Sequence, residues 1–192
     1  MNTHRLFIAI NLPEKIKNRL ASYQNNWPQL PAKWTRPENL HITLLFLGNV
    51  AEQDIPAALE IVKNTAQKYP PVNLKLTKIS YGPPQKIPPR MVWILAEKNE
   101  FLADLKKDIE QQLIDQNVHF QIEDRGFVPH ITFARLNNWE LRQIDPEEVP
   151  QIDEAINFDF EAKTIELMES QAKKSGAEYD ILESCELKGE GE

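Results

Sequence analysis

Two copies of the triplet His-Ile-Thr occur in this chain, at residues 41–43 and 130–132. Side chains at positions i and i+2 of a β-strand point to the same face, so each histidine shares a face with the following threonine. Imidazole has an unperturbed pKa of about 6.5, so one histidine can accept a proton while another donates one. Two such pairs facing each other would supply a base, an acid and two hydroxyl donors for phosphodiester cleavage.

A single His-x-Thr strand has an ordinary structural explanation, because histidine often satisfies a neighbouring carbonyl and threonine favours strands. The second copy, with the same central isoleucine and again before an apolar strand, favours catalysis. A zinc site is a weaker hypothesis, since neither triplet has a third ligand at metal-binding spacing. We therefore predict metal-free chemistry, with no cofactor, by four residues: His41, Thr43, His130 and Thr132.

The composition is that of a globular protein, with 192 residues of which 41% are hydrophobic and 27% charged. The net charge of −7 argues against a broad nucleic-acid-binding face, but it allows a local cluster of cations that grips one phosphate. The single cysteine, Cys185, excludes an internal disulfide, and no apolar run approaches the roughly 20 residues of a membrane span. These features predict a soluble cytoplasmic protein with no membrane association and no obligatory protein partner.

The hydrophobic pattern predicts the elements that must position the triplets. Strands are expected at residues 6–11, 33–35, 41–47, 72–81, 91–96, 130–136, 164–170 and 179–187, and helices after Pro13 and at 52–69 and 101–114. Strands mixed irregularly with helices favour an α+β fold over a doubly wound parallel sheet.

Each triplet opens a strand and follows a helix-containing half of the chain, which suggests an internal repeat. We predict one domain over residues 1–192 with two similar lobes, whose antiparallel sheets form a central cleft with the helices outside. Residues 188–192 are polar and are expected to be a frayed tail. On the first triplet strand, Ile42, Leu44 and Phe46 are expected to face the core, and Gly48 to end the strand.

The chain resembles the two-histidine phosphoesterase superfamily, and within it the RNA 2′,3′-cyclic phosphodiesterases, also called 2′-5′ RNA ligases. The resemblance covers nearly the whole chain. It rests on residues 5–10 (RLFIAI), 33–44 (KWTRPENLHITL), 89–93 (PRMVW), 127–135 (FVPHITFAR) and 175–179 (SGAEY). It implies the two-lobed α+β fold and hydrolysis of a terminal 2′,3′-cyclic phosphate on RNA to a 2′-phosphate. The joining of RNA ends through a 2′-5′ linkage, to which the second family name refers, is the reverse of a related step.

Matched by position, the resemblance assigns His41 as proton donor to the leaving 3′ oxygen and His130 as the proton acceptor that activates water. Thr43 and Thr132 match phosphate-binding threonines, and Arg135 matches a basic residue that follows the second motif in the family. In a regular strand Arg135 would point away from His130, so a bulge or a strand end is required there.

Other cations and aromatic residues flank the triplets. The candidates for substrate binding are Arg135, Arg90, Arg36, Trp34 and Phe127. An aromatic ring that stacks a base contributes roughly 1–3 kcal/mol, but for Trp34 and Phe127 core packing explains the residue equally well. Trp93 lies in an apolar strand and is expected in the core. Lys33, Lys86 and Arg125 could also line the cleft. A solvated surface charge is the ordinary alternative for each of these cations, and for Lys33 and Lys86 it explains the residue at least as well.

Two other functions stay open at this stage. The acidic balance slightly favours a phosphodiesterase that acts on small cyclic nucleotides or on an ADP-ribose cyclic phosphate. A non-catalytic module that binds RNA ends is the alternative of another class. The two intact triplets argue against the binding module, because binding alone does not require two titrating groups.

Overall fold

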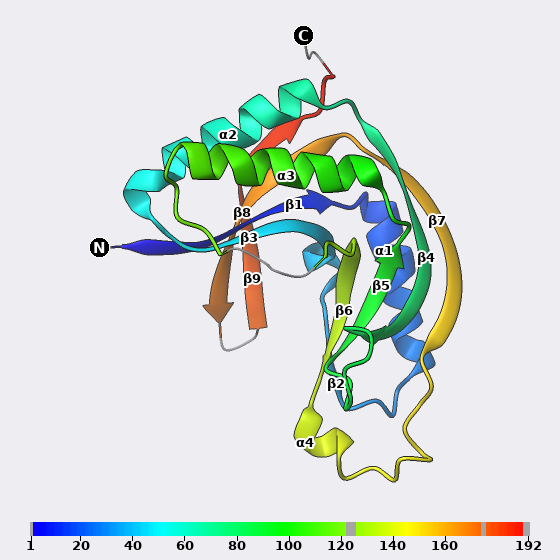
Figure 1. The fold of residues 1–192 in the computed structure, drawn as a ribbon. Helices are drawn as coiled ribbons and strands as arrows, with labels where there is room; N and C mark the ends of the chain where they lie inside the picture. The colour runs from blue at the N-terminus through cyan, green and yellow to red at the C-terminus, as the bar shows by residue number, and fades with distance from the viewer. Residues whose placement is uncertain (1, 122–125, 174–175, 190–192) are drawn as a thin grey trace.

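The structure is a computed structural model that describes residues 2–121, 126–173 and 176–189. Within these ranges the strands pair antiparallel in one sheet, in the order β7-β4-β5-β6-β3-β1-β8-β9, and β2 pairs with β6 (Figure 1). The strands are β1 (Thr3–Asn11), β2 (Ala32–Trp34), β3 (His41–Ala51), β4 (Val72–Gly82), β5 (Met91–Ala96), β6 (His130–Leu136), β7 (Asp153–Ala162), β8 (Thr164–Lys173) and β9 (Gly176–Glu186). This mainly antiparallel architecture confirms the predicted α+β fold.

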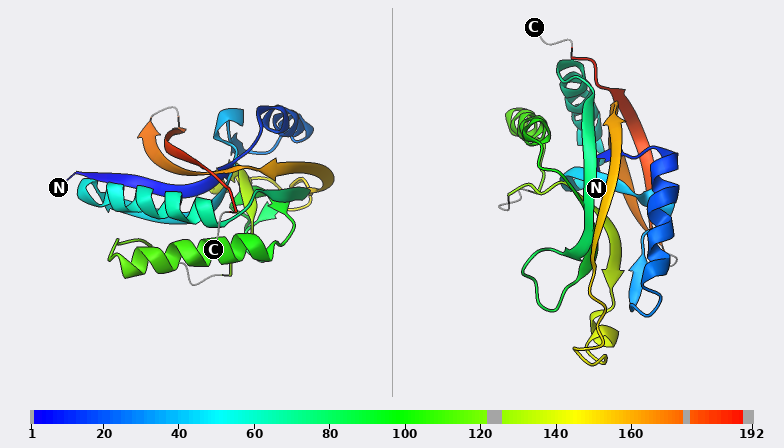
Figure 2. Two further views of the ribbon diagram at one scale, coloured as in Figure 1. Left: turned by 90° about the horizontal axis from the view of Figure 1, so that it is seen from above. Right: turned by 90° about the vertical axis from the view of Figure 1, so that its right-hand side faces the viewer.

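The helices cover both faces of the sheet. They are α1 (Glu14–Ser22), α2 (Ile55–Lys68), α3 (Glu100–Asp115) and α4 (Asn138–Leu141), with 3-10 turns η1 (Tyr23–Asn26), η2 (Pro37–Asn39) and η3 (Glu52–Asp54). Helices α2 and α3 lie together on one face, and α1 lies on the other (Figure 2). Each long helix buries one apolar stripe, such as Leu102, Leu105, Ile109 and Leu113 on α3, so the helices lie outside the strands as predicted.

The sheet consists of two halves that meet at a short seam. The first half contains β3, β1, β8 and β9, and the second contains β7, β4, β5 and β6. Among the described residues the halves pair only where Ile42 lies opposite Ile131, one residue inside the starts of β3 and β6. The arrangement matches the predicted pair of antiparallel sheets, and the seam brings together the two strands that carry the His-Ile-Thr triplets.

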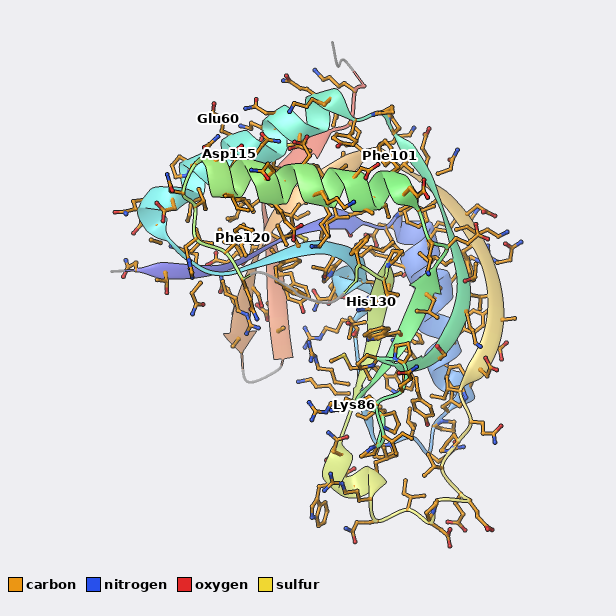
Figure 3. All side chains as sticks on the ribbon, in the orientation of Figure 1. Glu60, Lys86, Phe101, Asp115, Phe120 and His130 are labelled. Carbon is orange, nitrogen blue, oxygen red and sulfur yellow. The ribbon has the colours of Figure 1, made fainter. Side chains whose placement is uncertain are left out.

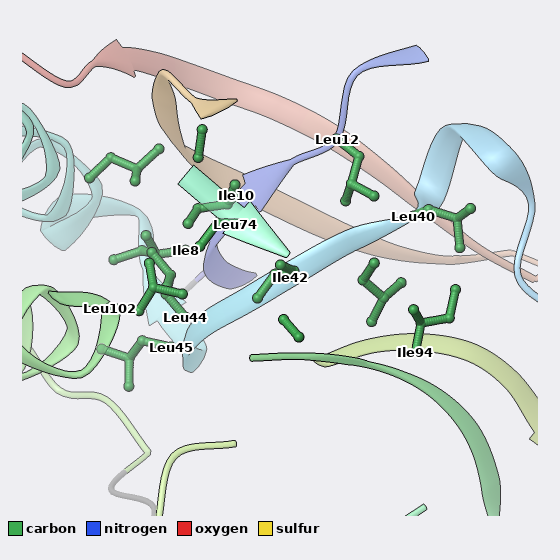
Figure 4. Close-up of a cluster of buried hydrophobic side chains, with 14 of the residues drawn as sticks. Ile8, Ile10, Leu12, Leu40, Ile42, Leu44, Leu45, Leu74, Ile94 and Leu102 are labelled. Carbon is green, nitrogen blue, oxygen red and sulfur yellow. The ribbon is translucent and has the colours of Figure 1, made fainter. Parts of the chain in front are cut away.

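The core lies behind the seam. Ile8 of β1, Ile42 of β3 and Ile94 of β5 are fully buried in one cluster with Leu102 of α3 (Figure 4). Each such aliphatic side chain stabilises the fold by about 1.5–3 kcal/mol relative to an exposed position. The apolar side of the seam is therefore fixed by packing, which leaves its polar side available to form a site.

Strand β3 does not end at Gly48 as the sequence predicts. It continues to Ala51, because Gly48 adopts a φ of +77° at a register shift beside Leu6 of β1. A left-handed φ at a bulge suits glycine, which has no Cβ to clash. The sequence pattern also assigns no element to β7, although Phe158 and Phe160 alternate there with exposed residues.

The end of the described chain packs against α2. The backbone N–H of Lys188 donates to the carbonyl of Ala66 over 3.1 Å, so the first residues of the expected frayed tail have a partner. Residues 190–192, and residues 174–175 of the predicted β8–β9 turn, lie outside the described residues. No described helix is long and apolar enough to cross a membrane.

Candidate active site

Both triplets lie at the seam, with His41 opening β3 and His130 opening β6 (Figure 3). In an antiparallel register, the pairing of Ile42 with Ile131 puts each histidine beside the threonine of the other strand. Since both isoleucines are fully buried, the histidines and threonines share the opposite face. Diagonal neighbours in such a pair lie roughly 7–8 Å apart, which leaves room for one phosphate between the two imidazoles.

Each imidazole is held by the carbonyl two residues before it. His41 Nδ1 lies 2.7 Å from the carbonyl oxygen of Asn39, and His130 Nδ1 lies 2.7 Å from that of Val128. A carbonyl only accepts, so Nδ1 carries the proton and donates it in both rings, and Nε2 is the nitrogen that loses its proton in the neutral ring. In His41, Nε2 lies 3.1 Å from the hydroxyl oxygen of Thr43.

Burial lowers the pKa of His41 to about 4. The contact with the Asn39 carbonyl acts in the opposite direction, and electrostatic repulsion by Lys17, and by His130 when that ring is protonated, lowers the pKa further. The His41 ring is therefore neutral at pH 7 in the free protein. The influence of His130 also means that the two imidazoles are close enough to interact electrostatically.

The two imidazoles have different aromatic neighbours. Phe7 and Tyr179 contact His41, with ring centroids 5.0 and 5.2 Å away, and the Tyr179 ring lies nearly perpendicular to the imidazole. Trp93 stacks face to face on His130, with centroids 3.7 Å apart and an interplanar angle of 22°. Sequence reasoning gave none of these three aromatic residues a place in the site.

The prediction that Trp93 is buried is confirmed, but the residue lies outside the main core cluster. It lies opposite Thr132 across the β5–β6 pair and therefore shares the face that carries the threonine and histidine. On its other side, Gly82 leaves the room that the indole needs, because a Cβ there would lie only 2.3 Å from Trp93 Cδ2. The sequence pattern could not distinguish this face from the core, because the strand is buried on both faces.

A matching β-bulge follows each triplet. On β3, Thr43 pairs with Ala9 and Leu45 with Ile8, so Leu44 is the extra residue. On β6, Thr132 pairs with Trp93 and Ala134 with Val92, which leaves Phe133 as the extra residue at the same position. The burial pattern of the first seven residues is the same in the two strands.

The bulges turn the sixth residue of each strand back to the polar face. Arg135 consequently lines a cavity together with His41, through the irregularity that the sequence analysis required. Phe46 was predicted to face the core, and this is wrong: it is 43% exposed and lines the same cavity. Its place in the core is taken by Leu45, because the bulge at Leu44 buries two successive residues.

The first cavity has a volume of about 350 Å³ and opens over His41. Its polar lining includes Arg5, Thr43, Thr132 and Arg135, and its aromatic lining includes Phe7, Phe46 and Tyr179. No Asp or Glu of the described chain lines it. His130 is not part of the lining; it lies beside Thr43 at the edge of the seam.

A second cavity, of about 170 Å³, adjoins the first and shares Thr35, Asn39, Arg135 and Tyr179 with it. Arg36 and Trp34, two predicted substrate-binding residues, line this second cavity. Trp34 also stacks on Trp27 at 6.3 Å and contacts Phe133 edge-on at 5.2 Å, so it has a packing role as well.

The other candidates lie away from both cavities. Phe127 packs against the core, and Arg90 is exposed, with only its carbonyl held by the backbone N–H of Leu136. Lys86 lies exposed on the loop between β4 and β5 (Figure 3), and Arg125 lies outside the described residues. Within the described ranges, no group of three His, Cys, Asp or Glu residues could hold a metal ion.

Two imidazoles oriented through their Nδ1 atoms lie at one seam, beside a cavity lined by two threonine hydroxyls and a guanidinium. These are the features of a phosphoesterase of the two-histidine type. The comparisons with known proteins agree with this class. The sequence matches the family described as LigT like Phosphoesterase over residues 10–93 and 95–179. The chain therefore belongs to the LigT-like phosphoesterase family.

Similar proteins cover nearly the whole chain. The RNA 2′,3′-cyclic phosphodiesterase of Methanocaldococcus jannaschii is 32% identical, over 93% of this chain and 98% of its own length. That of Thermus thermophilus is 30% identical, over 97% and 91%. A crystal structure of a Thermus thermophilus protein has a TM-score of 0.81 at 29% identity, covering 98% of this chain and 99% of that one. Escherichia coli LigT complexed with 3′-AMP shares the fold, with a TM-score of 0.77 at 24% identity over 97% and 99%.

Proposed function

We propose that this enzyme hydrolyses 2′,3′-cyclic phosphate ends of RNA to 2′-phosphate ends, using its two histidines and no metal. The observation that carries the proposal is the pairing of Ile42 with Ile131, because this pairing brings both triplets to one face of one seam. The names of the relatives that share 30–32% identity with most of the chain support the same reaction and substrate class.

The proposed reaction is an in-line displacement at phosphorus. His130 Nε2 takes a proton from water as the water oxygen attacks, and His41 donates a proton to the 3′ oxygen as its bond to phosphorus breaks. Thr43 and Thr132 donate hydrogen bonds to the non-bridging oxygens, and Arg135 balances their negative charge. The products are a 2′-phosphate and a free 3′-hydroxyl, and proton exchange with water restores both imidazoles.

The donor role of His41 places a demand on the substrate. Since the pKa of His41 is about 4 in the free protein, the bound phosphodiester must raise it before the ring can donate at pH 7. An anion close to an imidazole acts in this direction, because it stabilises the protonated form. The Asn39 carbonyl already stabilises that form on the Nδ1 side.

The size of the first cavity also suits a single nucleotide, so a phosphodiesterase acting on small cyclic nucleotides is the second candidate. The same site would join a 2′,3′-cyclic phosphate end to an RNA 5′-hydroxyl when that hydroxyl takes the place of water: the 5′ oxygen bonds to phosphorus, the 3′ oxygen leaves, and a 2′-5′ linkage results. A cytoplasmic location is part of the proposal, because a single cysteine suits a reducing compartment.

The test is hydrolysis of a short RNA that ends in a 2′,3′-cyclic phosphate, with the product identified as the 2′- or 3′-phosphate. We expect His41→Ala and His130→Ala each to lower kcat by about 10²–10⁴, the range for a positioned acid or base. This corresponds to about 3–5 kcal/mol of barrier. The matched control is His119→Ala, an exposed histidine outside both cavities, which should keep full activity.

EDTA should leave the rate unchanged if no metal takes part. Full activity in either triplet variant would reject the mechanism. Tight binding of the RNA without any product over hours would instead favour a non-catalytic module for RNA ends. Faster turnover of a nucleoside 2′,3′-cyclic phosphate than of the oligonucleotide would favour the small-nucleotide function.

A further inference from the structure

The second cavity is lined by three cations, Lys33, Arg36 and Arg135, and by no Asp or Glu of the described chain. The whole sequence carries more acidic than basic residues, 29 against 22. The lining of the second cavity, with cations and no carboxylates, therefore differs in charge from the chain as a whole. The excess of positive charge in a concave site favours an anionic ligand.

Two of these cations lie directly opposite each other across a strand pair. Lys33 of β2 pairs in register with Arg135 of β6, and both side chains are exposed. Like charges at opposed positions destabilise a sheet, unless an anion lies between them. The arrangement therefore has a structural cost that binding of an anion would remove.

The described part of the chain supplies no such anion. Neither Lys33 nor Arg135 forms an ion pair with any described residue, and Arg36 reaches only the exposed Glu38, at 4.0 Å. The contrast is with the lysines of α2 and β4. Those in ion pairs there are Lys63, Lys68, Lys75 and Lys78.

The second cavity is continuous with the site of the proposed reaction. Arg135 lines both cavities, and it follows Thr132 by three residues, about 10 Å along a strand. Thr35, also shared, donates its hydroxyl to the carbonyl of Thr132 over 2.8 Å and its backbone N–H to that of Phe133 over 2.9 Å. These bonds fix the cations of β2 relative to the phosphate-binding end of β6.

We propose that the second cavity binds the 5′-phosphate of the terminal nucleotide, the group that links this nucleotide to the rest of the RNA. The inference rests on the proposed function, because the cyclic phosphate must lie at the two histidines for the next phosphate to reach Lys33 and Arg36. A cationic groove that follows the backbone is the usual way to hold a single strand. It makes this enzyme selective for RNA ends over free cyclic nucleosides.

The experiment compares two small substrates, adenosine 2′,3′-cyclic phosphate with and without a 5′-phosphate. In the wild-type protein, we expect the 5′-phosphate to raise kcat/KM by about tenfold, as a charge-assisted contact would. Lys33→Gln and Arg36→Gln should each reduce this ratio toward one. The matched control is Lys98→Gln, because Lys98 is also exposed and without an ion pair in the described chain but lies between β5 and α3.

Salt dependence gives a second measurement. For the 5′-phosphorylated substrate, the fall of kcat/KM with increasing salt should be weaker in Lys33→Gln, because one of the cations that attract the 5′-phosphate is lost. Equal turnover of both substrates by the wild type, or an unchanged ratio in both cavity variants, would overturn the second phosphate site while leaving the proposed function intact. A wild-type protein that cleaves neither these two substrates nor a short RNA with a 2′,3′-cyclic phosphate end would overturn the proposed function and this inference together.

Discussion

Strands β3 and β6 begin with the same triplet and have the same local backbone structure around it. Both hold the histidine by the carbonyl two residues upstream, both contain a bulge at the residue after the threonine, and both follow the same order of buried and exposed positions. The strands differ in what surrounds them. His41 contacts the rings of Phe7 and Tyr179, whereas His130 stacks on Trp93.

The backbone features that the two strands share position the imidazoles, and the side chains that differ give each imidazole its own surroundings. The shared backbone holds each imidazole through its Nδ1 atom at the start of a strand, and the two strands pair at one seam. In the proposed mechanism, the unlike neighbours would allow one imidazole to act as acid and the other as base. At the sixth position, Phe46 of β3 corresponds to Arg135 of β6, so the aromatic wall and the guanidinium of the cavity come from equivalent places. We interpret the two halves as an internal repeat whose members diverged in side chains.

The largest expected effect separates the roles of the two histidines. A cyclic phosphate whose 3′ oxygen is replaced by sulfur has a leaving group that needs no protonation, because a thiol is far more acidic than an alcohol. On this substrate, the loss of about 10²–10⁴ in His41→Ala should shrink to within about tenfold, since the missing acid is no longer needed. His130→Ala should remain slow, because water still requires a base. Single-turnover rates with both substrates give the comparison.

The reverse pattern, with rescue of His130→Ala, would make His130 the donor. It would agree with the low pKa of His41 in the free protein and would reverse the assignment that the family resemblance implies. No rescue in either variant would mean that the departure of the 3′ oxygen is not assisted by an imidazole.

The second effect concerns the pH dependence of stability. His41 has a pKa of about 4 in the folded protein and about 6.5 when unfolded, so the unfolded chain binds more protons between these values. The free energy of unfolding should therefore be unaffected by His41 above pH 6.5 and fall as the pH drops toward 4, by up to roughly 3 kcal/mol. Urea unfolding at several pH values should show this loss in the wild type but not in His41→Gln.

The matched variant is His130→Gln, which keeps His41 and should keep most of the slope. Some of the slope should be lost, because the charge of His130 is one cause of the low pKa. A His41→Gln protein that loses as much stability as the wild type over this range would contradict a buried, neutral His41.

The four triplet residues could be found from the sequence, because a repeated tripeptide in a strand defines both residue type and face. Phe46 could not, since one extra residue at Leu44 reverses the faces of the residues from Leu45 up to the next register shift at Leu47. The need for an irregularity before Arg135 was visible, because a basic residue at that position conflicts with strict alternation. Its location at Phe133 was not.

The aromatic neighbours of the imidazoles were hidden for another reason. Trp93 and Tyr179 reach the histidines through strand pairs that join distant parts of the chain, and neither pairing leaves a local pattern. The cationic second cavity is similar, because Lys33 meets Arg135 only through the β2–β6 pair. Local patterns predicted the faces of strands, whereas the contacts across strands depended on register.

The smallest expected effect concerns the support that Trp93 gives to His130. Trp93→Leu removes the ring under the imidazole and should lower kcat about tenfold with little change in KM, because loss of orientation affects the reacting geometry more than binding. Trp93→Phe keeps a stacking face and should restore most of the rate. It also deletes the buried indole Nε1, which has no acceptor among the described residues, so its cost in stability should be limited to lost packing.

Gly82→Ala should disturb the stacking of Trp93 on His130, because the new Cβ would lie only 2.3 Å from Cδ2 of the indole. It should therefore reproduce the kcat defect of Trp93→Leu with the tryptophan still present. Tyr179→Leu is the counterpart on the other strand, since it removes an edge contact to His41 and also a wall of the cavity, and it should raise KM as well. If Trp93→Leu raised KM while leaving kcat unchanged, Trp93 would serve the substrate and not the orientation of His130.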